Sequence, residues 1–191
     1  MNGLLAKTAA IMCLAALSCS CAKPKDPQDF GKKKAAKEDP EVVDTVKNHI
    51  FVGYVTYWDT VMPPIGLVTH VNYAFGKVAS TFDAVTIKTP SRLQKIVKER
   101  NEKYPDVKVL LSIGGWGAGN FSEMAADSVK RLKFCESCLA QCKKYGLDGI
   151  DMDWEYPTSS SAGISSSKDD TKNFTKLMRD LRATLGPDLL L

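Results

Sequence analysis

The stretch from Asp148 to Pro157 reads DGIDMDWEYP, and its pattern is the most informative in the chain. Side chains alternate between the two faces of a β-strand, and this stretch alternates acidic with apolar residues. One face carries three acids: Asp151, Asp153 and Glu155. The other face carries three apolar residues: Ile150, Met152 and Trp154. The sequence therefore predicts a strand over residues 147–156, with its apolar face in the core and its acidic face opposite.

The spacing of the three carboxyl groups predicts that they interact. Successive members lie roughly 6–7 Å apart along a strand, so their charges repel each other, and burial removes their hydration. At least one of them is therefore expected to keep its proton near neutral pH, which is the state that a general acid requires. A Mg²⁺ or Ca²⁺ site remains the alternative, because three carboxylates can also hold such an ion.

Strands and helices alternate along the rest of the chain. Clusters of β-branched and aromatic residues predict strands at 49–58, 70–78 and 107–113, and the start of another at 188–191. Helical spacing of apolar residues predicts helices at 91–104, with Ser91 as N-cap, at 122–145 and at 169–185. This order favours parallel βαβ units, in either an open doubly wound sheet or a (β/α)8 barrel. No glycine-rich phosphate-binding pattern follows a strand, which argues against a nucleotide-binding protein.

Two motifs resemble those of glycoside hydrolase family 18. DGIDMDWEYP at 148–157 is similar to the DGxDxDxE signature of that family. Ser112-Ile-Gly-Gly-Trp116 resembles its second signature, SxGG, at the end of the third barrel strand. The two motifs occur in the family's order on successive strands, and the resemblance covers about His49 to Leu191.

The resemblance implies both a fold and a reaction. Members of the family are (β/α)8 barrels whose active site lies at the C-terminal ends of the strands. They hydrolyse β-1,4-linked N-acetylglucosamine polymers such as chitin, and they retain the anomeric configuration. The nucleophile is the acetamido oxygen of the substrate itself, an exception to the two-carboxylate scheme. We therefore expect a glycosidase that needs no cofactor and no metal.

The resemblance also gives each acid a role. Glu155 would protonate the leaving glycosidic oxygen. Asp153 would orient the acetamido group and stabilise the positively charged oxazolinium. Asp151 would hydrogen-bond Asp153 and tune the shared protons. Asp148 has the opposite parity along the strand, so we expect a structural role for it.

Further residues are candidates for contact with the sugar: Trp116, Gly115, Gly114, Tyr54, Phe75 and Tyr156. The indole of Trp116 would supply a stacking face. Tyr54 and Phe75 match positions on the first and second strands of chitinase-like members. The alternative roles are a tight turn for the two glycines and core packing for the aromatic residues.

The sequence also bears on three alternative functions. An endo-β-N-acetylglucosaminidase acting on N-glycans shares the acid pair, but the Trp-Glu-Tyr-Pro run favours a chitinase. A non-hydrolysing chitin-binding fragment is the other alternative, and the presence of Glu155 argues against it. The net charge is only +4, and no basic stripe with interleaved aromatic residues points to nucleic acid.

The length of the chain limits how much of a barrel it can form. A (β/α)8 barrel needs about 250 residues, whereas residues 49–191 hold only the first four to five βα units. We therefore expect a truncated barrel, in which strand edges are left uncovered. Such a chain would fold poorly or self-associate, and it would have little activity.

The N-terminal residues are expected to lie outside the catalytic domain. An apolar run at 8–17 precedes Cys19 and Cys21, and residues 1–21 resemble a bacterial lipoprotein signal. Lipid attachment is expected at Cys19, or at Cys21, which would export the protein and anchor it to a membrane. An ordinary cleaved signal or a short anchor is the alternative. Residues 22–48 are rich in Lys, Asp, Glu and Pro, and they predict a charged, flexible tether.

Three cysteines lie on one predicted helix, at Cys135, Cys138 and Cys142. Their spacing places them on a single helical face. A metal site would need a fourth ligand, and no suitable His or Cys lies nearby in the sequence. We therefore expect the three thiols to pack in the core, where cysteine is commonly found.

Overall fold

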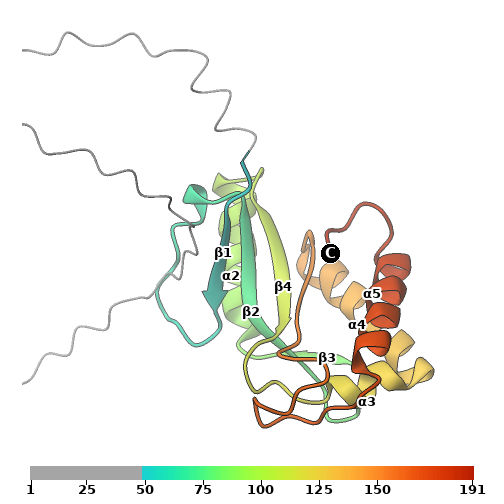
Figure 1. The fold of residues 1–191 in the computed structure, drawn as a ribbon. Coiled ribbons are helices and arrows are strands. Elements are labelled where there is room, and N and C mark those ends of the chain that lie inside the picture. The colour runs from blue at the N-terminus through green and yellow to red at the C-terminus, as the bar shows by residue number, and fades with distance from the viewer. Residues whose placement is uncertain (1–48) are drawn as a thin grey trace, which may run out of the picture.

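The computed structural model describes residues 49–191, so the predicted signal peptide (1–21) and tether (22–48) lie outside the described residues. Figure 1 shows the elements in their arrangement. In chain order they are β1 (Val52–Thr56), a short 3-10 helix η1 (Ile65–Leu67), β2 (His70–Val78), β3 (Val85–Ile87), α2 (Pro90–Lys103), β4 (Lys108–Gly114), α3 (Phe121–Ala126), α4 (Ser128–Tyr145), β5 (Gly149–Asp153) and α5 (Asp170–Leu185).

A parallel sheet with the strand order β1-β2-β4-β5 forms the centre of the fold. This arrangement confirms the predicted parallel βαβ units. The short strand β3 pairs antiparallel with the end of β2 and was not predicted. Three residues are too few to show a clear alternation of apolar and polar side chains, so no sequence pattern predicts this strand.

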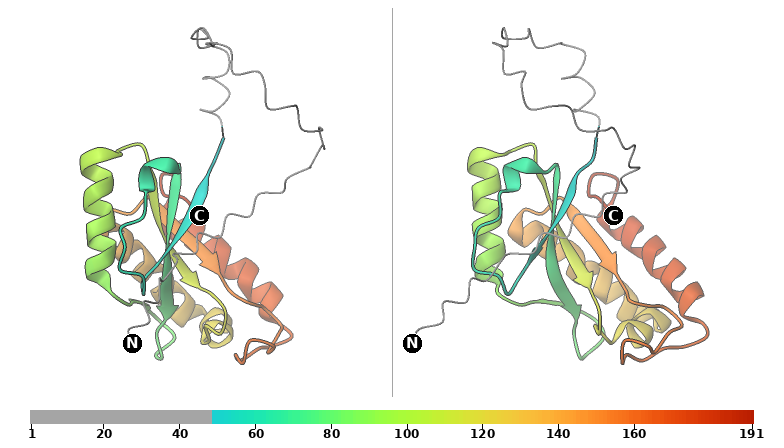
Figure 2. Two further views of the ribbon diagram at one scale, coloured as in Figure 1. Left: turned by 90° about the vertical axis from the view of Figure 1, so that its left-hand side faces the viewer. Right: turned by 60° about the vertical axis from the view of Figure 1, so that its left-hand side comes forward.

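One face of the sheet packs against the helices, which lie together on that side in Figure 2. The side chains that fill this layer are fully buried and come from both the strands and the helices: Tyr73, Val109, Leu111, Ile113, Ile150, Leu93, Phe134, Leu177 and Leu181. Strands covered on one face by their own crossover helices are what a βαβ architecture requires. Among the described residues, no helix is long and apolar enough to cross a membrane.

The three helix cysteines belong to this core, as expected. Cys135, Cys138 and Cys142 are buried free thiols on α4. Burial raises the pKa of Cys135 to about 12 and that of Cys142 to about 11. The pKa of Cys138 lies well above its ordinary value for the same reason. At neutral pH the thiols are therefore protonated and act as small apolar side chains.

Two helix predictions need correction. The predicted helix 122–145 is two helices, because Asp127 ends α3 and caps α4: its Oδ1 accepts hydrogen bonds from the backbone N–H of Val129 (2.8 Å) and Lys130 (3.0 Å). An aspartate that bonds these N–H groups satisfies free donors at a new helix start. The helix predicted from Ser91 begins one residue earlier, at Pro90, so Ser91 is not its N-cap. Proline is favoured at the first helical position because it lacks the N–H that would be unpaired there.

The ends of β5 also differ from the prediction. The strand covers 149–153, so Glu155 follows its end and does not lie within it. Asp148 precedes it and has the structural role that we expected. Its carboxylate accepts hydrogen bonds from Arg100 Nη1 (2.5 Å) and the Val109 N–H (2.8 Å), tying β5 to α2 and β4. Leu190 forms a parallel bridge with Gly149, where the start of another strand was predicted.

Candidate active site

Three acids emerge at the C-terminal end of β5, on the face of the sheet away from the helices. Asp151 and Asp153 lie in the strand and Glu155 lies two residues beyond it, and all three are partly buried. Of the apolar residues that alternate with them, Ile150 and Trp154 are buried in the core and Met152 is partly buried against it. The Trp154 ring stacks on Phe121 (centroids 5.3 Å apart) and meets Phe174 edge-on (6.0 Å). This packing holds the backbone immediately before Glu155.

Asp151 is held by a residue from the far end of the sheet. The hydroxyl group of Tyr54 on β1 donates a hydrogen bond of 2.8 Å to Asp151 Oδ2. In a flat sheet β1 and β5 would lie about 14 Å apart, because β2 and β4 separate them. The contact therefore requires the sheet to curve toward its acidic face. Burial raises the pKa of Tyr54 to about 12, so this hydroxyl stays protonated as a donor.

Asp153 is the carboxyl group whose proton affinity changes most clearly. Burial, the charge of Glu155, the charge of Asp151 and a hydrogen bond with Glu155 raise its pKa to about 6, against an ordinary value of 3.8. The sequence predicted that at least one member of the row would keep its proton near neutral pH, and the raised pKa of Asp153 is a shift in that direction. Asp153 and Glu155 therefore form a coupled pair that can hold one proton between them.

Gly114 and Gly115, at the end of β4, allow the backbone to approach the acids closely. A β-carbon on Gly114 would lie 1.9 Å from the carbonyl oxygen of Asp153, and the backbone φ of 130° is itself unfavourable for other residues. The N–H of Gly115 donates to that same carbonyl at 2.8 Å. A β-carbon on Gly115 would lie 2.8 Å from the ring of Phe75. Both glycines thus position the acid strand.

The predicted aromatic residues surround the same strand ends. Trp116 is 64% exposed and Tyr156 is 51% exposed, and their rings meet edge-on with centroids 6.2 Å apart. Tyr54 and Phe75 form a second pair, with centroids 6.4 Å apart. Flat, exposed aromatic faces next to carboxyl groups can stack on sugar rings while the acids reach the bonds between them. The structure thus brings every predicted site residue among 49–191 to one end of the sheet.

Lys77, at the end of β2, is a site residue that the sequence analysis missed. Its Nζ donates a hydrogen bond of 2.7 Å to the carbonyl oxygen of Gly114. Its charge acts on both Asp153 and Glu155. The sequence does contain an indication of this role, because a lysine near the end of a buried strand, two residues after the candidate Phe75, is unusual.

Asp170 is a second residue that was missed, and it holds the loop that follows the acids. It is fully buried. Its carboxylate accepts hydrogen bonds from Ser122 Oγ (2.7 Å), the Thr158 N–H (3.1 Å) and the Ser167 N–H (2.7 Å). Because Thr158 is only three residues beyond Glu155, this cluster fixes the chain just after the candidate acid.

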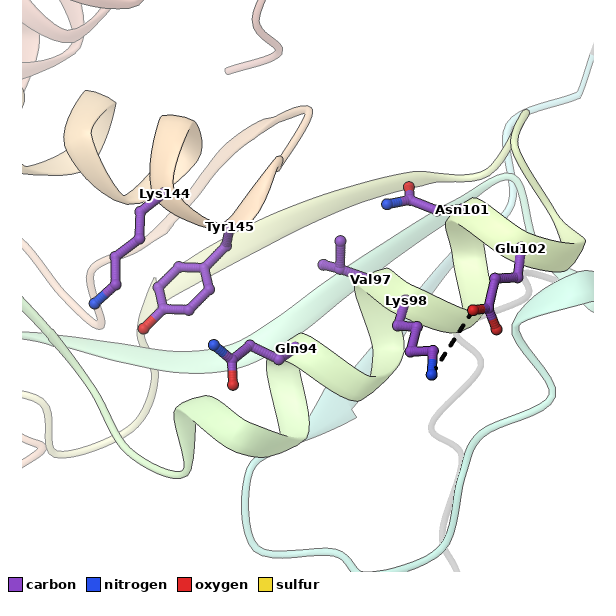
Figure 3. A pocket seen from close by; sticks show the side chains of 7 residues that line it. All are labelled: Gln94, Val97, Lys98, Asn101, Glu102, Lys144 and Tyr145. Carbon is purple, nitrogen blue, oxygen red and sulfur yellow. Dashed lines mark ion pairs between the residues drawn. The ribbon is translucent and has the colours of Figure 1, made fainter.

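Two hollows of the described surface lie away from the acids. The first, of about 340 Å³, lies between α2 and α4, as Figure 3 shows, and is lined by Gln94, Val97, Lys98, Asn101, Glu102, Lys144 and Tyr145. The second, of about 410 Å³, is lined by Asp59, Thr60, Met62, Thr89, Ser91, Arg92 and Lys95. Neither is lined by a carboxyl group of the acid row.

Comparison with known proteins supports a single assignment. The family model for glycosyl hydrolases family 18 matches residues 50–191. The chitinase domain of the spore coat protein CotE from Clostridium difficile is 36% identical, with a TM-score of 0.71, over 75% of this chain and 41% of that one. A family 18 N-acetylglucosaminidase from Paenibacillus barengoltzii is 38% identical, with a TM-score of 0.66, over 72% and 41%. A probable chitinase 2 of Drosophila melanogaster is 32% identical over 154 residues, which is 70% of this chain and 31% of that protein. The chain thus spans less than half the length of each of these relatives.

Proposed function

The chain belongs to glycoside hydrolase family 18. We propose that it supplies the catalytic acids of an enzyme that hydrolyses β-1,4-linked N-acetylglucosamine polymers, namely chitin or chitooligosaccharides. The observation that carries the proposal is the coupled pair of Asp153 and Glu155, in which the pKa of Asp153 is raised to about 6. A proton held between two carboxyl groups up to about pH 6 is available for transfer to a glycosidic oxygen.

The proposed reaction uses the acetamido group of the substrate as the nucleophile. The acetamido oxygen bonds to the anomeric carbon while the glycosidic bond breaks, and Glu155 transfers its proton to the leaving oxygen. Asp153 then faces the positively charged oxazolinium and balances its charge. Water then bonds to the anomeric carbon from the side that the leaving group vacated, the bond from this carbon to the acetamido oxygen breaks, and the water gives a proton to the Glu155 carboxylate, so the anomeric configuration is retained. Asp151, held by Tyr54, would hydrogen-bond Asp153 and tune the protons that the acids share.

The aromatic residues would bind the sugar chain on either side of the acids. The exposed Trp116 and Tyr156 offer faces next to Glu155, and Tyr54 and Phe75 offer a second surface beside Asp151. Sugar rings stack on such faces through their C–H groups, while their hydroxyl groups remain available for hydrogen bonds. This arrangement suits an extended oligosaccharide that lies across the end of the sheet.

We further propose that the sheet is the first part of a (β/α)8 barrel. The hydrogen bond between Tyr54 and Asp151 supports this, because it requires the curvature that a closed barrel has. Covering the acidic face by further strands would exclude water and strengthen the electrostatic interactions of the acids. For the N-terminal residues we propose export and attachment to a membrane through a lipid on Cys19 or Cys21.

The substrate class is tested by direct comparison of hydrolysis rates. Chromogenic chitobiose and chitotriose glycosides are offered alongside a high-mannose glycopeptide. A chitinase cleaves the first two and leaves the glycopeptide intact. Cleavage of the glycopeptide alone would identify an endo-β-N-acetylglucosaminidase. Binding of chitooligosaccharides without turnover of any substrate would indicate a chitin-binding protein instead.

A further inference from the structure

Lys77 lies next to the acids, yet the proposed reaction gives it no role. Its Nζ donates to the Gly114 carbonyl at 2.7 Å and lies 5.4 Å from the centroid of the Phe75 ring. Gly114 is the partner of Asp153 in the pairing of β4 with β5. The ammonium group is therefore fixed by a carbonyl oxygen and an aromatic face, beside the strand that carries the acids.

The local structure of β2 explains why this lysine points toward the acids. The pairing of β2 with β4 shifts its register between Ala74 and Gly76. After the shift, the position of a side chain on Gly76 would lie against the core residues Val85 and Leu111. Since side chains alternate along a strand, Lys77 faces the opposite side, where the acids lie.

The strand β3 fixes the backbone of Lys77. Lys77 pairs with Thr86 in the antiparallel ladder. The hydroxyl group of Thr86 also donates to the Lys77 carbonyl at 3.3 Å. Both the backbone and the ammonium group are thus held, so the charge occupies a defined position.

We propose that Lys77 is a positioning residue of the acid site, whose fixed positive charge sets the pH at which Asp153 loses its proton. The role rests on the proposed function, in which Asp153 must become negative while Glu155 gives up its proton. A nearby ammonium group lowers the free energy of that negative charge. Without it, the carboxyl pair would hold its proton to a higher pH and Asp153 would balance the oxazolinium less well.

The charged and titratable groups around Asp153 act in opposite directions. Burial favours the protonated form of Asp153 most, and the charges of Glu155 and Asp151 on the same segment add to this effect. Lys77 on β2 is the cation that opposes them. Tyr54 on β1 faces the same acids and remains a neutral donor. Lys88, beyond β3, acts on Lys77: burial and then this second cation lower the pKa of Lys77, while Asp153 and Glu155 raise it.

The test is a pH titration of the Asp153 carboxyl group by carbon NMR, in the 191-residue chain with labelled aspartate. The signal is assigned by its loss in Asp153→Asn. Lys77→Met removes the charge, Lys77→Gln keeps a hydrogen-bond donor without the charge, and Lys77→Arg keeps the charge. Lys88→Met is the matched control, because it removes a nearby exposed cation that repels Lys77 and lies over the ring of Tyr57. The titration needs no turnover, so its result stands independently of the substrate assays.

The wild-type chain should titrate near pH 6. We expect the midpoint to rise by about half a pH unit or more in Lys77→Met and in Lys77→Gln, the modest size reflecting partial exposure to water. It should stay close to the wild-type value in Lys77→Arg and Lys88→Met. An unchanged midpoint in a folded Lys77→Gln variant, or an equal rise in Lys77→Arg, would show that Lys77 only ties β2 to β4. If Lys77→Met fails to fold, Lys77→Gln and Lys77→Arg decide between the two outcomes.

Discussion

Gly114 and Asp153 face each other across β4 and β5 so closely that a β-carbon on Gly114 would lie 1.9 Å from the Asp153 carbonyl oxygen. The next residue, Gly115, donates its N–H to that same oxygen at 2.8 Å. The position of Asp153 therefore depends on the absence of a side chain on the neighbouring strand. The pair of glycines in the second motif and the acids in the first motif form one structural unit.

The first prediction concerns this contact. Gly114→Ala should destabilise the chain by about 2–4 kcal/mol, because it adds a backbone clash to an unfavourable φ. Urea unfolding followed by circular dichroism measures the loss. Gly119→Ala is the control, since the nearest atom to its β-carbon would be 3.9 Å away. Equal stabilities of the two variants would contradict the proposed contact.

The second prediction concerns the dependence of stability on pH. The pKa of Asp153 is raised from 3.8 to about 6 by folding, so the folded chain binds more protons than the unfolded chain between these values. The stability that this group contributes is therefore lost as the pH rises from about 4 to about 6. Asp153→Asn removes the effect and should gain on the order of 1 kcal/mol relative to the wild type across that interval, a value reduced for partial exposure.

Urea unfolding at pH 4, 5, 6 and 7 tests this prediction. Asp106→Asn, a change at an exposed acid outside the site, serves as the control. A stability difference between wild type and Asp153→Asn that does not change with pH would show that folding leaves the proton affinity of Asp153 unaltered.

The third prediction concerns the loop after Glu155. Asp170→Ala leaves the buried hydroxyl of Ser122 and the N–H groups of Thr158 and Ser167 without their acceptor. Unpaired buried donors cost about 1–3 kcal/mol each, so we expect a loss of about 2–4 kcal/mol after partial relaxation. Amide hydrogen exchange at Thr158 and Ser167 should become faster. The neighbouring Asp169→Ala should leave both amides protected, and equal exchange in the two variants would refute the role of Asp170.

The fourth prediction concerns Cys19 and Cys21. Cells that express the protein are grown with a palmitate analogue that can be detected after purification. The label should be present on the wild-type protein and absent from the Cys19→Ala, Cys21→Ala double variant. Label that persists in the double variant would exclude lipid attachment at these cysteines. The two single variants identify which cysteine carries the lipid.

The sequence was sufficient to predict the features that depend on local pattern. Alternation along 148–157 predicted the burial of Ile150 and Trp154, and β-branched clusters predicted the strands that pair in parallel. The helix break at Asp127 was missed, because an aspartate inside an amphipathic pattern is compatible with both a continuous helix and a new N-cap.

The features that were missed depend on contacts between distant segments. Lys77 faces the side of the acids only because the register of β2 shifts by one residue, and no property of residues 70–78 alone predicts that shift. Asp170 acts on Thr158 and Ser122 through the tertiary fold. The sequence also could not show which carboxyl group has the raised pKa, because burial in the fold is the largest cause of the shift at Asp153.

The fifth prediction concerns Glu155 as the general acid. In a protein that contains this chain within a complete barrel, Glu155→Gln should bind N-acetylglucosamine oligomers with nearly unchanged affinity, because the stacking faces of Trp116 and Tyr156 remain. Loss of general acid catalysis should lower turnover of these oligomers by about 10²–10⁴-fold. The decisive measurement is therefore kcat for chitooligosaccharides in the wild type and in Glu155→Gln, with affinity measured on the same preparations. A large fall in kcat with binding preserved is the predicted result, and near wild-type turnover in Glu155→Gln would contradict the mechanism.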